Sequence, residues 1–202
     1  MSGDRAEPRT TLADEPDRAR WNRKYAAGEG PAHFRPKPFL AEHGDLLAGG
    51  RALDAACGFG GNALYLAELG YRVDAVDISD VALAQARAEA TRQGLHKAID
   101  FIQADLDRWP VPPARYDLIV VFYYLNRDLM PRLARGLRPG GLLFQANHNE
   151  RFLAVRPGFD PDYLLAVGEL RQMALDAGLE IVYYADSTPD DDANARLIAR
   201  RP

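Results

Sequence analysis

Apolar and polar positions along the chain change their spacing in a regular way. Five short stretches are continuously apolar or alternate with a period of two, which predicts buried or half-buried strands. They are RALDAA, YRVDAVDI, AIDFIQA, YDLIVVFYY and LLFQAN, which begin at Arg51, Tyr71, Ala98, Tyr116 and Leu142. Helical spacing predicts helices over residues 62–69, 80–93 and 127–137 between them. Alternating strands and helices imply a parallel sheet with helices on both faces.

The pattern changes toward the end of the chain. After an expected helix over residues 167–177, the stretches EIVYYA at 180–185 and ARLIAR at 195–200 have the composition of two further strands. The connection between them is too short for a helical crossover, so we expect them to pair antiparallel. The predicted fold class is therefore α/β, with a Rossmann-like seven-stranded, mostly parallel sheet, the last strand antiparallel, and helices on both faces.

The first fifty residues carry a weaker pattern. Residues 1–13 are polar without periodicity, which predicts a disordered N-terminal tail. Residues 14–202 are predicted to form a single domain, in which 14–50 supply N-terminal helices and a loop that covers a cofactor. Trp21 and Tyr25 lie four positions apart and share a helix face. That face either packs on the main domain or closes over a ligand, and the sequence leaves both open.

Composition narrows the class of protein. The chain has 202 residues, of which 47% are hydrophobic, and a net charge of −4 with a pI of about 5.6. It has no basic stripe, which argues against nucleic-acid binding. Cys57 is the single cysteine, and no apolar stretch is long enough for a secretory signal or a membrane span. We therefore expect a cytoplasmic protein with no membrane partner, either a monomer or a homodimer.

A glycine-rich turn follows the first strand. The run Gly58-Phe59-Gly60-Gly61-Asn62-Ala63 fits the pattern G-x-G-x-x-G/A, in which the backbone approaches a ligand closely at the start of a helix. Asp77 comes 17 residues after Gly60, at the end of the second strand. A carboxylate there can accept hydrogen bonds from both ribose hydroxyls, so the sequence predicts a ligand of the adenosine type.

Three features separate the ligands that contain adenosine. Asp54 precedes the turn, where it would repel a pyrophosphate and tolerate a cationic group. Asp105 ends the third strand, where its carboxylate can accept from an adenine amine. The final antiparallel strand pair differs from the usual dinucleotide order. S-adenosylmethionine fits all three, because it combines adenosine with a sulfonium and has no phosphate. An NAD(P)-dependent oxidoreductase and a non-catalytic adenosine-ligand binding protein stay open as alternatives.

The stretch from Leu53 to Ser79, with WNRKYAAGEG, LRPGG and GEL elsewhere, resembles the class I S-adenosylmethionine-dependent methyltransferases. The helix after the turn is similar to the small-molecule subgroup that contains tellurite-resistance and thiopurine-type methyltransferases. The resemblance implies a methyltransferase that uses S-adenosyl-L-methionine, forms S-adenosyl-L-homocysteine and acts on a small molecule. Ala56 stands where many members have glycine, and we expect alanine to fit there.

The resemblance also implies a set of cofactor contacts. The backbone of the glycine turn would line the methionine portion, and Asp54 would help order that turn. Phe122 would face the methionine amino group or the methyl group. Asp77 would hold the ribose, and Ile78 would pack on the adenine. Asp105 and the residue after it would contact the adenine edge. The predicted cofactor-binding residues are Tyr25, Asp54, Ala56, Cys57, Gly58, Gly60, Asn62, Asp77, Ile78, Ser79, Asp105, Leu106 and Phe122.

The methyl acceptor should lie above the carboxyl ends of the strands. His148 is the preferred general base where one is needed, with a structural role left open, and Tyr123 is the second candidate catalytic residue. The predicted substrate-binding residues are His33, Arg35, Tyr124, Asn126 and Arg151. The connection over residues 148–163 is long and is a candidate lid. The fourth strand ends without an acid, so no metal is expected. The sequence does not identify the acceptor.

Overall fold

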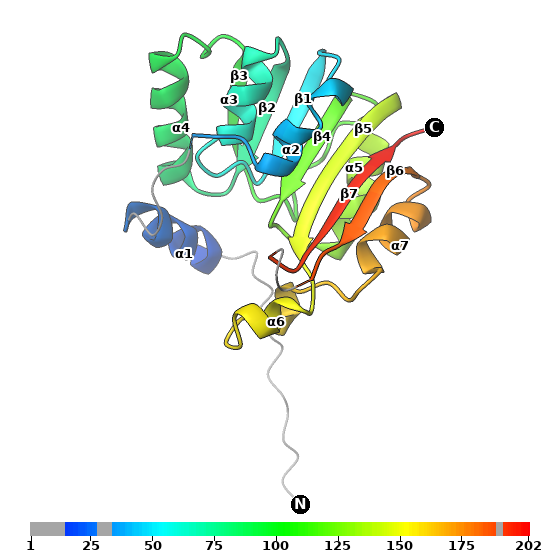
Figure 1. Cartoon of the computed structure of the whole chain (residues 1–202). Coiled ribbons are helices and arrows are strands. Elements are labelled where there is room, and N and C mark those ends of the chain that lie inside the picture. Colours follow the sequence, from blue (N-terminus) through cyan, green and yellow to red (C-terminus); the bar gives the residue numbers. More distant parts are fainter. Residues whose placement is uncertain (1–14, 28–33, 189–191) are drawn as a thin grey trace, which may run out of the picture.

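The fold is built on one seven-stranded sheet with the strand order β3-β2-β1-β4-β5-β7-β6 (Figure 1). A computed structural model describes residues 15–27, 34–188 and 192–202, so the tail predicted over 1–13 and the candidate His33 lie outside the described residues. The strands are β1 (Arg51–Ala55), β2 (Arg72–Asp77), β3 (Ile99–Gln103), β4 (Tyr116–Phe122), β5 (Leu137–His148), β6 (Glu180–Asp186) and β7 (Asn194–Arg200). Neighbouring strands are parallel except at β7, which is antiparallel to β5 and β6. The predicted fold class is confirmed.

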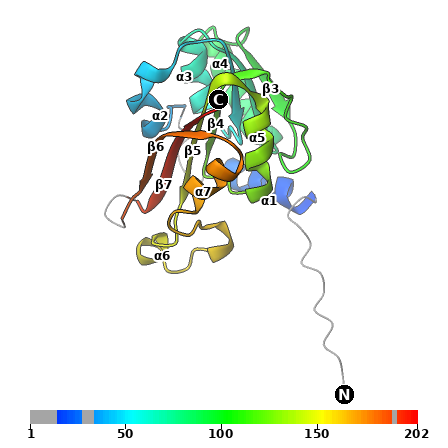
Figure 2. The same cartoon turned by 90° about the vertical axis from the view of Figure 1, so that its right-hand side faces the viewer.

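Helices cover both faces of the sheet. They are α1 (Glu15–Ala26), α2 (Pro38–Glu42), α3 (Gly61–Glu68), α4 (Asp80–Arg92), α5 (Met130–Gly136), α6 (Phe152–Val155) and α7 (Glu169–Asp176). Short 3-10 turns occupy Gly44–Leu46, Arg127–Leu129 and Pro161–Tyr163. Figure 2 shows α2 and α3 on one side of the sheet and α5 and α7 on the other. Within the described ranges, no helix is both long and apolar enough to cross a membrane.

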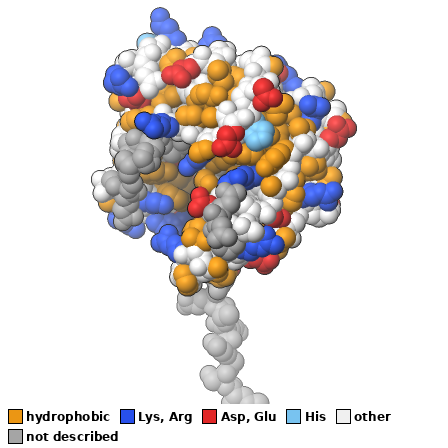
Figure 3. Space-filling view, in the orientation of Figure 1, with side chains coloured by type: hydrophobic (Ala, Val, Ile, Leu, Met, Phe, Trp, Pro, Cys, Tyr) orange, Lys and Arg blue, Asp and Glu red, His pale blue; other side chains and the backbone are white. Residues whose placement is uncertain are grey.

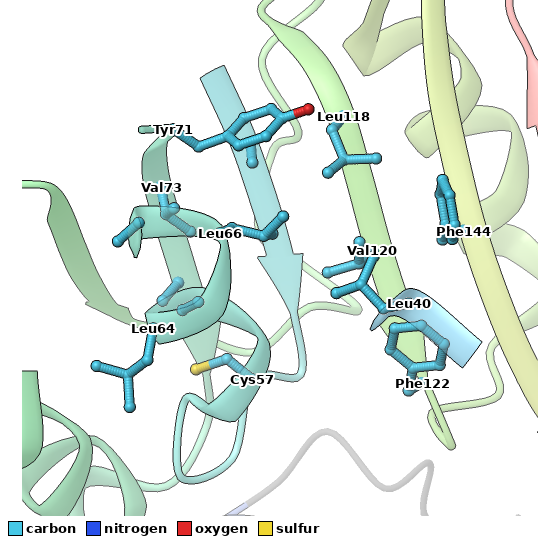
Figure 4. Packing of buried hydrophobic residues seen from close by; sticks show 14 of the residues in the cluster. Leu40, Cys57, Leu64, Leu66, Tyr71, Val73, Leu118, Val120, Phe122 and Phe144 are labelled. Carbon is cyan, nitrogen blue, oxygen red and sulfur yellow. The ribbon is translucent and has the colours of Figure 1, made fainter. Parts of the chain in front are cut away.

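Two clusters of buried side chains explain why the central strands are apolar on both faces. In β1, Ala52 belongs to the cluster under α2 and α3, whereas Leu53 belongs to the cluster under α5 and α7. Figure 4 shows the first cluster, in which side chains of α3 such as Leu66 point toward the strands that carry Val73 and Val120. A strand covered on both faces needs a nearly continuous apolar sequence, as found here.

The fifth strand is longer than the sequence predicts. β5 begins at Leu137 rather than at Leu142, so residues 139–141 lie inside the strand instead of separating it from the preceding helix. The register of β4 against β5 shifts near this start. Gly140 donates its backbone N–H to the carbonyl of Arg201 at 2.7 Å. The proline and glycines are accommodated because this end of the strand is irregular.

The long connection after β5 is bonded to the residue that follows β6 and to the residue that precedes β7. Asn149 donates its backbone N–H to the carbonyl of Ala193 at 2.8 Å and its side-chain amide to the carbonyl of Ser187 at 3.2 Å. Leu165 donates its N–H to the carbonyl of His148 at 3.0 Å, so the connection leaves β5 and returns beside it. These bonds fix both ends of the segment, and its role as a lid stays a prediction.

Candidate active site

A cavity of about 710 Å³ opens at the carboxyl ends of the parallel strands. β2, β4 and β5 end on this cavity with Asp77, Phe122 and His148, and α1 lies along one side of it. Figure 3 shows this face of the molecule hollowed, with apolar, acidic and basic side chains exposed around the hollow. The volume falls within the range of about 300–1,000 Å³ that small-molecule pockets occupy.

The glycine turn between β1 and α3 lines the cavity. Gly58 and Gly60 have φ angles of 52° and 74°, in the left-handed region that favours glycine. Ala56 has a φ of 57°, so its side chain carries a strain that glycine would avoid. Cys57 donates its N–H to the carbonyl of Val76 at 3.0 Å, which ties the turn to β2. Ala56 is therefore accommodated, but in an unfavourable backbone conformation.

The Cys57 thiol is a small buried group. Its residue exposes 7% of its surface, and in Figure 4 the side chain lies among the apolar cluster beside α3. Burial raises the pKa of this thiol well above its usual value, and the nearby Asp77 and Asp54 raise it further. A thiol held neutral in this way does not act as a nucleophile at neutral pH.

Asp77 joins the turn to the end of β2. Its Oδ2 accepts the N–H of Gly58 at 2.8 Å, and its Oδ1 accepts the N–H of Ser79 at 2.9 Å. Asp77 lines the cavity, although only 6% of its surface is exposed. A carboxylate oxygen has room for more than one hydrogen bond, so each oxygen can accept a further donor from the cavity. This geometry suits the predicted ribose contact.

Asp105 follows β3, the strand beside β2, and also lines the cavity. Its Oδ1 accepts the N–H of Asp107 at 2.9 Å. Its Oδ2 is buried and has no hydrogen-bond partner among the described residues. The nearest cation is the Nε of Arg108, 4.0 Å away, which is beyond hydrogen-bond distance. A buried acceptor without a donor is unfavourable, so a ligand donor at this position would stabilise the site.

Helix α1 is attached to the start of α4 by polar contacts. The side chain of Asn22 accepts the Ser79 hydroxyl at 2.6 Å and donates to Asp80 at 2.8 Å. The opposite edge of α1 places Trp21 and Tyr25 on the cavity, their rings 5.8 Å apart. The aromatic face therefore packs beside the glycine turn and lines the cavity, and its closure over a ligand stays a prediction.

Three of the predicted cofactor contacts lie behind the cavity wall. Asp54, Gly60 and Ser79 do not line the cavity. Asp54 Oδ2 accepts the N–H of Ala63 at 3.0 Å, which caps α3, and the Ser79 hydroxyl accepts the N–H of Ala82 at 3.1 Å, which caps α4. These residues hold the turn and the helix starts in place. The other ten residues predicted to contact the cofactor all line the cavity.

Asp54 is expected to make stability depend on pH. Burial raises the pKa of Asp54 to about 7, although hydrogen bonds from Asn62 and Ala63 lower it. In the unfolded chain the carboxyl has a pKa of about 3.9, so folding becomes less favourable as the pH rises from about 4 to about 7. We expect Asp54→Asn to gain on the order of 4 kcal/mol over the parent protein across that window, because its side chain does not ionise and a shift of about three pKa units corresponds to that energy.

Urea denaturation of both proteins at several pH values tests this expectation, with the exposed Asp100→Asn as the matched control. The difference between Asp54→Asn and the parent should grow up to neutral pH and then stay level. A difference that is the same at all pH values would show that Asp54 remains ionised in the folded protein.

The predicted acceptor-side residues separate into two groups. Tyr123, His148, Arg35 and Tyr124 line the cavity. Asn126 and Arg151 do not. The Tyr124 hydroxyl donates to Asp107 at 2.6 Å, and the Asn126 amide donates to the same oxygen at 2.5 Å. Tyr124 therefore lines the cavity while its hydroxyl donates to a carboxylate.

His148 lies in an aromatic environment at the end of β5. Its ring stacks on Phe152 with centroids 3.7 Å apart and an interplanar angle of 8°, and Tyr123 lies 4.9 Å away. Burial lowers the pKa of His148. Burial therefore favours the neutral imidazole, the state in which it can accept a proton. The geometry is compatible with the general-base role and with a structural role.

Several cavity residues were not among the sequence candidates. They are Asp17, Arg20, Lys24, Lys37, Phe59, Gly61, Ala104, Asp107, Leu125, Asn147, Phe152, Phe159 and Tyr163. Lys37 had a usable signal, because it stands between Pro36 and Pro38 and the residue between two prolines is conformationally restricted. In the parts of the chain that the structure describes, no group of three or more His, Cys, Asp or Glu is placed to hold a metal ion.

Known sequences match the part of the chain that carries the glycine turn. Residues 52–141 match a family of proteins described as methyltransferase domain. Malonyl-[acyl-carrier protein] O-methyltransferase of Enterobacter lignolyticus (strain SCF1) is 40% identical over 98 residues, which are 46% of this chain and 37% of that enzyme. The chain spans between about a third and two thirds of the length of the curated relatives it matches.

Solved structures share the architecture over most of the chain. A structure from work on the conversion of a disulfide bond into a thioacetal group during echinomycin biosynthesis is 26% identical, with a TM-score of 0.68 and 92% of each chain covered. An S-adenosylmethionine-dependent methyltransferase from Mesorhizobium loti shares the fold at 21% identity, with a TM-score of 0.67, over 81% of this chain and 98% of that chain.

The matches favour one of the ligands that the sequence left open. They support S-adenosylmethionine as the cofactor, as predicted, and none of them favours a nicotinamide nucleotide. The sheet order and the antiparallel β7 agree with this class of enzyme. Residues 52–141 therefore match a methyltransferase domain, and the chain shares its fold with a solved S-adenosylmethionine-dependent methyltransferase.

Proposed function

We propose that this protein transfers the methyl group of S-adenosylmethionine to a small-molecule acceptor. The observation that carries the proposal is the pair of carboxylates on adjacent strands at one wall of the cavity. Asp77 presents two oxygens beside the glycine turn, and Asp105 presents a buried Oδ2 with no hydrogen-bond partner among the described residues. A ribose and an adenine amine supply the donors that these oxygens can accept.

The remaining contacts follow from the same arrangement. Ile78 and Leu106 offer apolar surface for an adenine ring between the two carboxylates. The backbone of the turn at Cys57 and Gly58 would receive the methionine portion, whose positive charge suits the acidic surroundings. When bound, S-adenosylmethionine supplies a methyl group on a positively charged sulfur. The residues of this chain would align the acceptor with that group and exclude water.

Tyr123 and His148 are placed to serve the acceptor. Both line the cavity at the ends of neighbouring strands β4 and β5, and their rings lie 4.9 Å apart. We infer that they position the acceptor, and that neutral His148 accepts its proton when the reacting group carries one. Arg35 and Tyr124 would complete the acceptor pocket. Asn126 and Arg151 do not line the cavity and would support the pocket without touching the acceptor.

The finer class of the enzyme is also part of the proposal. The helix after the glycine turn supports a relationship to tellurite-resistance and thiopurine-type methyltransferases. The net charge of −4 and the single cysteine support a cytoplasmic protein that does not bind nucleic acid. Gel filtration coupled to light scattering distinguishes the two proposed assemblies, a monomer and a homodimer.

Thermal unfolding in the presence of each cofactor tests the proposed function. S-adenosylmethionine and S-adenosylhomocysteine should both raise the midpoint, because a ligand that binds only the folded state stabilises it. NADH should leave the midpoint unchanged. A shift with NADH and none with S-adenosylhomocysteine would instead support the oxidoreductase. Labelled methyl transfer to tellurite, thiols, amines and phenols then separates an enzyme from a protein that only binds the cofactor.

A further inference from the structure

The part of the cavity away from the acidic residues is walled by aromatic rings. Tyr123, His148, Phe152 and Phe159, here called the aromatic wall, all line the cavity. Phe159 meets His148 and Phe152 edge-on, at 5.8 Å and 5.1 Å between centroids. Edge-to-face and stacked contacts of this kind leave flat apolar surface that a further aromatic ring can join. The wall therefore favours a planar apolar ligand.

Two cations lie over this wall. The Nζ of Lys37 is 4.9 Å from the centroid of the Tyr123 ring, and the guanidinium carbon of Arg156 is 5.9 Å from that of Phe159. Neither cation has a carboxylate within 4.0 Å among residues 15–27, 34–188 and 192–202. Each contacts a ring face instead, which is a weaker interaction than an ion pair.

Three acidic side chains of the cavity have partners other than Lys37 and Arg156. Asp17 pairs with Arg20 at 3.0 Å, Asp107 accepts two side-chain hydrogen bonds, and Asp77 accepts two backbone N–H groups. Asp77 and Asp105 lie on the side proposed for the cofactor. We call the part of the cavity around these two acids the cofactor half, and the part around the aromatic wall, Lys37 and Arg156 the acceptor half.

Lys37 is held in place by its backbone. It stands between Pro36 and Pro38, which restrict its conformation, and Pro38 begins α2. Its N–H donates to Oδ1 of Asn62 at 2.9 Å, which ties the segment to the start of α3. Burial lowers the pKa of the Lys37 ammonium. A partly desolvated cation fixed in this way gains more from an anionic partner than a freely solvated surface lysine does.

We propose that the acceptor is a small aromatic molecule that carries a negative charge. Its ring lies against the aromatic wall, and its anionic group binds Lys37, with Arg156 as the second cation. The inference rests on the proposed function, since it names the class of molecule that the acceptor half of the same cavity takes. Lys37 is the residue that selects for the charge, and the wall selects for the ring.

Binding of three benzene derivatives of similar size tests this selection. Benzoate, neutral benzamide and cationic benzylamine are titrated into the protein by calorimetry, with and without saturating S-adenosylhomocysteine. Benzoate is expected to bind at least about tenfold more tightly than benzamide, because a charge-assisted contact replaces a neutral one. Benzylamine is expected to bind most weakly.

Variants assign the preference to particular residues. Lys37→Met should reduce benzoate affinity to that of benzamide while leaving benzamide and S-adenosylhomocysteine affinities unchanged. Lys97→Met removes the same charge from an exposed site outside the cavity, and should leave the preference for benzoate intact. Phe152→Leu should weaken benzoate and benzamide alike, because both lose the ring contact.

The outcomes separate this inference from the proposed function. Equal binding of the three compounds, binding of none of them, or an unchanged preference for benzoate in Lys37→Met would each overturn the inference. Absence of S-adenosylhomocysteine binding to the parent protein would overturn the proposed function. The titrations without that ligand report on the anion preference independently.

Discussion

Asp77→Ala is expected to weaken S-adenosylhomocysteine binding by at least about a hundredfold. The carboxylate oxygens of Asp77 hold the backbone N–H groups of Gly58 and Ser79, and the same oxygens are the proposed acceptors for both ribose hydroxyls. Two hydrogen bonds to a charged group contribute about 3 kcal/mol or more to binding, which corresponds to this factor. Calorimetric titration of the purified variant gives the dissociation constant directly.

Two further variants show whether the loss concerns the ligand or the turn. Asp77→Asn keeps one acceptor oxygen and the shape of the side chain, so its loss of affinity should be smaller. Asp100→Ala removes an exposed acid from β3 and should bind as the parent does. Thermal unfolding without ligand measures the structural effect of each change. If Asp77→Ala binds S-adenosylhomocysteine as tightly as the parent, the ribose contact is wrong.

Gly61→Ala is expected to destabilise the fold by about 1–3 kcal/mol through overpacking. A Cβ at Gly61 would lie 2.2 Å from the carbonyl oxygen of Arg35 and 2.9 Å from its carbonyl carbon. Both are backbone atoms, which cannot rotate away. Alanine is otherwise favoured over glycine at a helical position, so a loss of stability would show that the steric term dominates. Urea denaturation measures the change in the free energy of unfolding.

The same substitution should also disturb the acceptor half of the cavity. Relief of the contact requires the segment from Arg35 to Lys37 to move away from α3, which carries the Lys37 ammonium with it. Gly158→Ala is the matched control, because a Cβ there meets nothing within 4 Å and the backbone is not left-handed. We expect that control to match the parent protein. Equal stability of Gly61→Ala and Gly158→Ala would contradict the argument.

The cofactor half of the site could be predicted from sequence because its parts are close along the chain. The turn at Gly58, the carboxylate of Asp77 and the carboxylate of Asp105 occupy strand ends that alternate with helices, and parallel pairing brings these ends to one edge. Most of the predicted residues on the turn or at those ends line the cavity, but Gly60 does not. Asp54 and Ser79 do not line it either, since a polar residue beside a ligand site can equally cap a helix.

The acceptor half was harder to predict because distant segments form it. Lys37, Tyr123 and Arg156 meet there from three separate connections, and no spacing within one segment indicates that they do. Arg151 and Asn126 follow the right strands, yet neither lines the cavity, and the Asn126 amide donates to Asp107 instead. The early start of β5 was also missed, because Pro139 and two glycines normally end a regular element rather than lie within one.

The position of β7 has a consequence for the order in which the two halves assemble. Within the described part of the chain, β6 pairs with β7 alone, and the Asn149 backbone that leads into the aromatic wall is bonded to Ala193. The glycine turn, Asp77 and Asp105 of the cofactor half lie within residues 51–107, whereas the segment that leads into the aromatic wall is held by a contact across more than forty positions. Because closing long loops precedes any gain from the contacts they make, the cofactor half should form first and the acceptor half last. A chain emerging from the ribosome would then acquire the means to hold its methyl donor before it can select what to methylate.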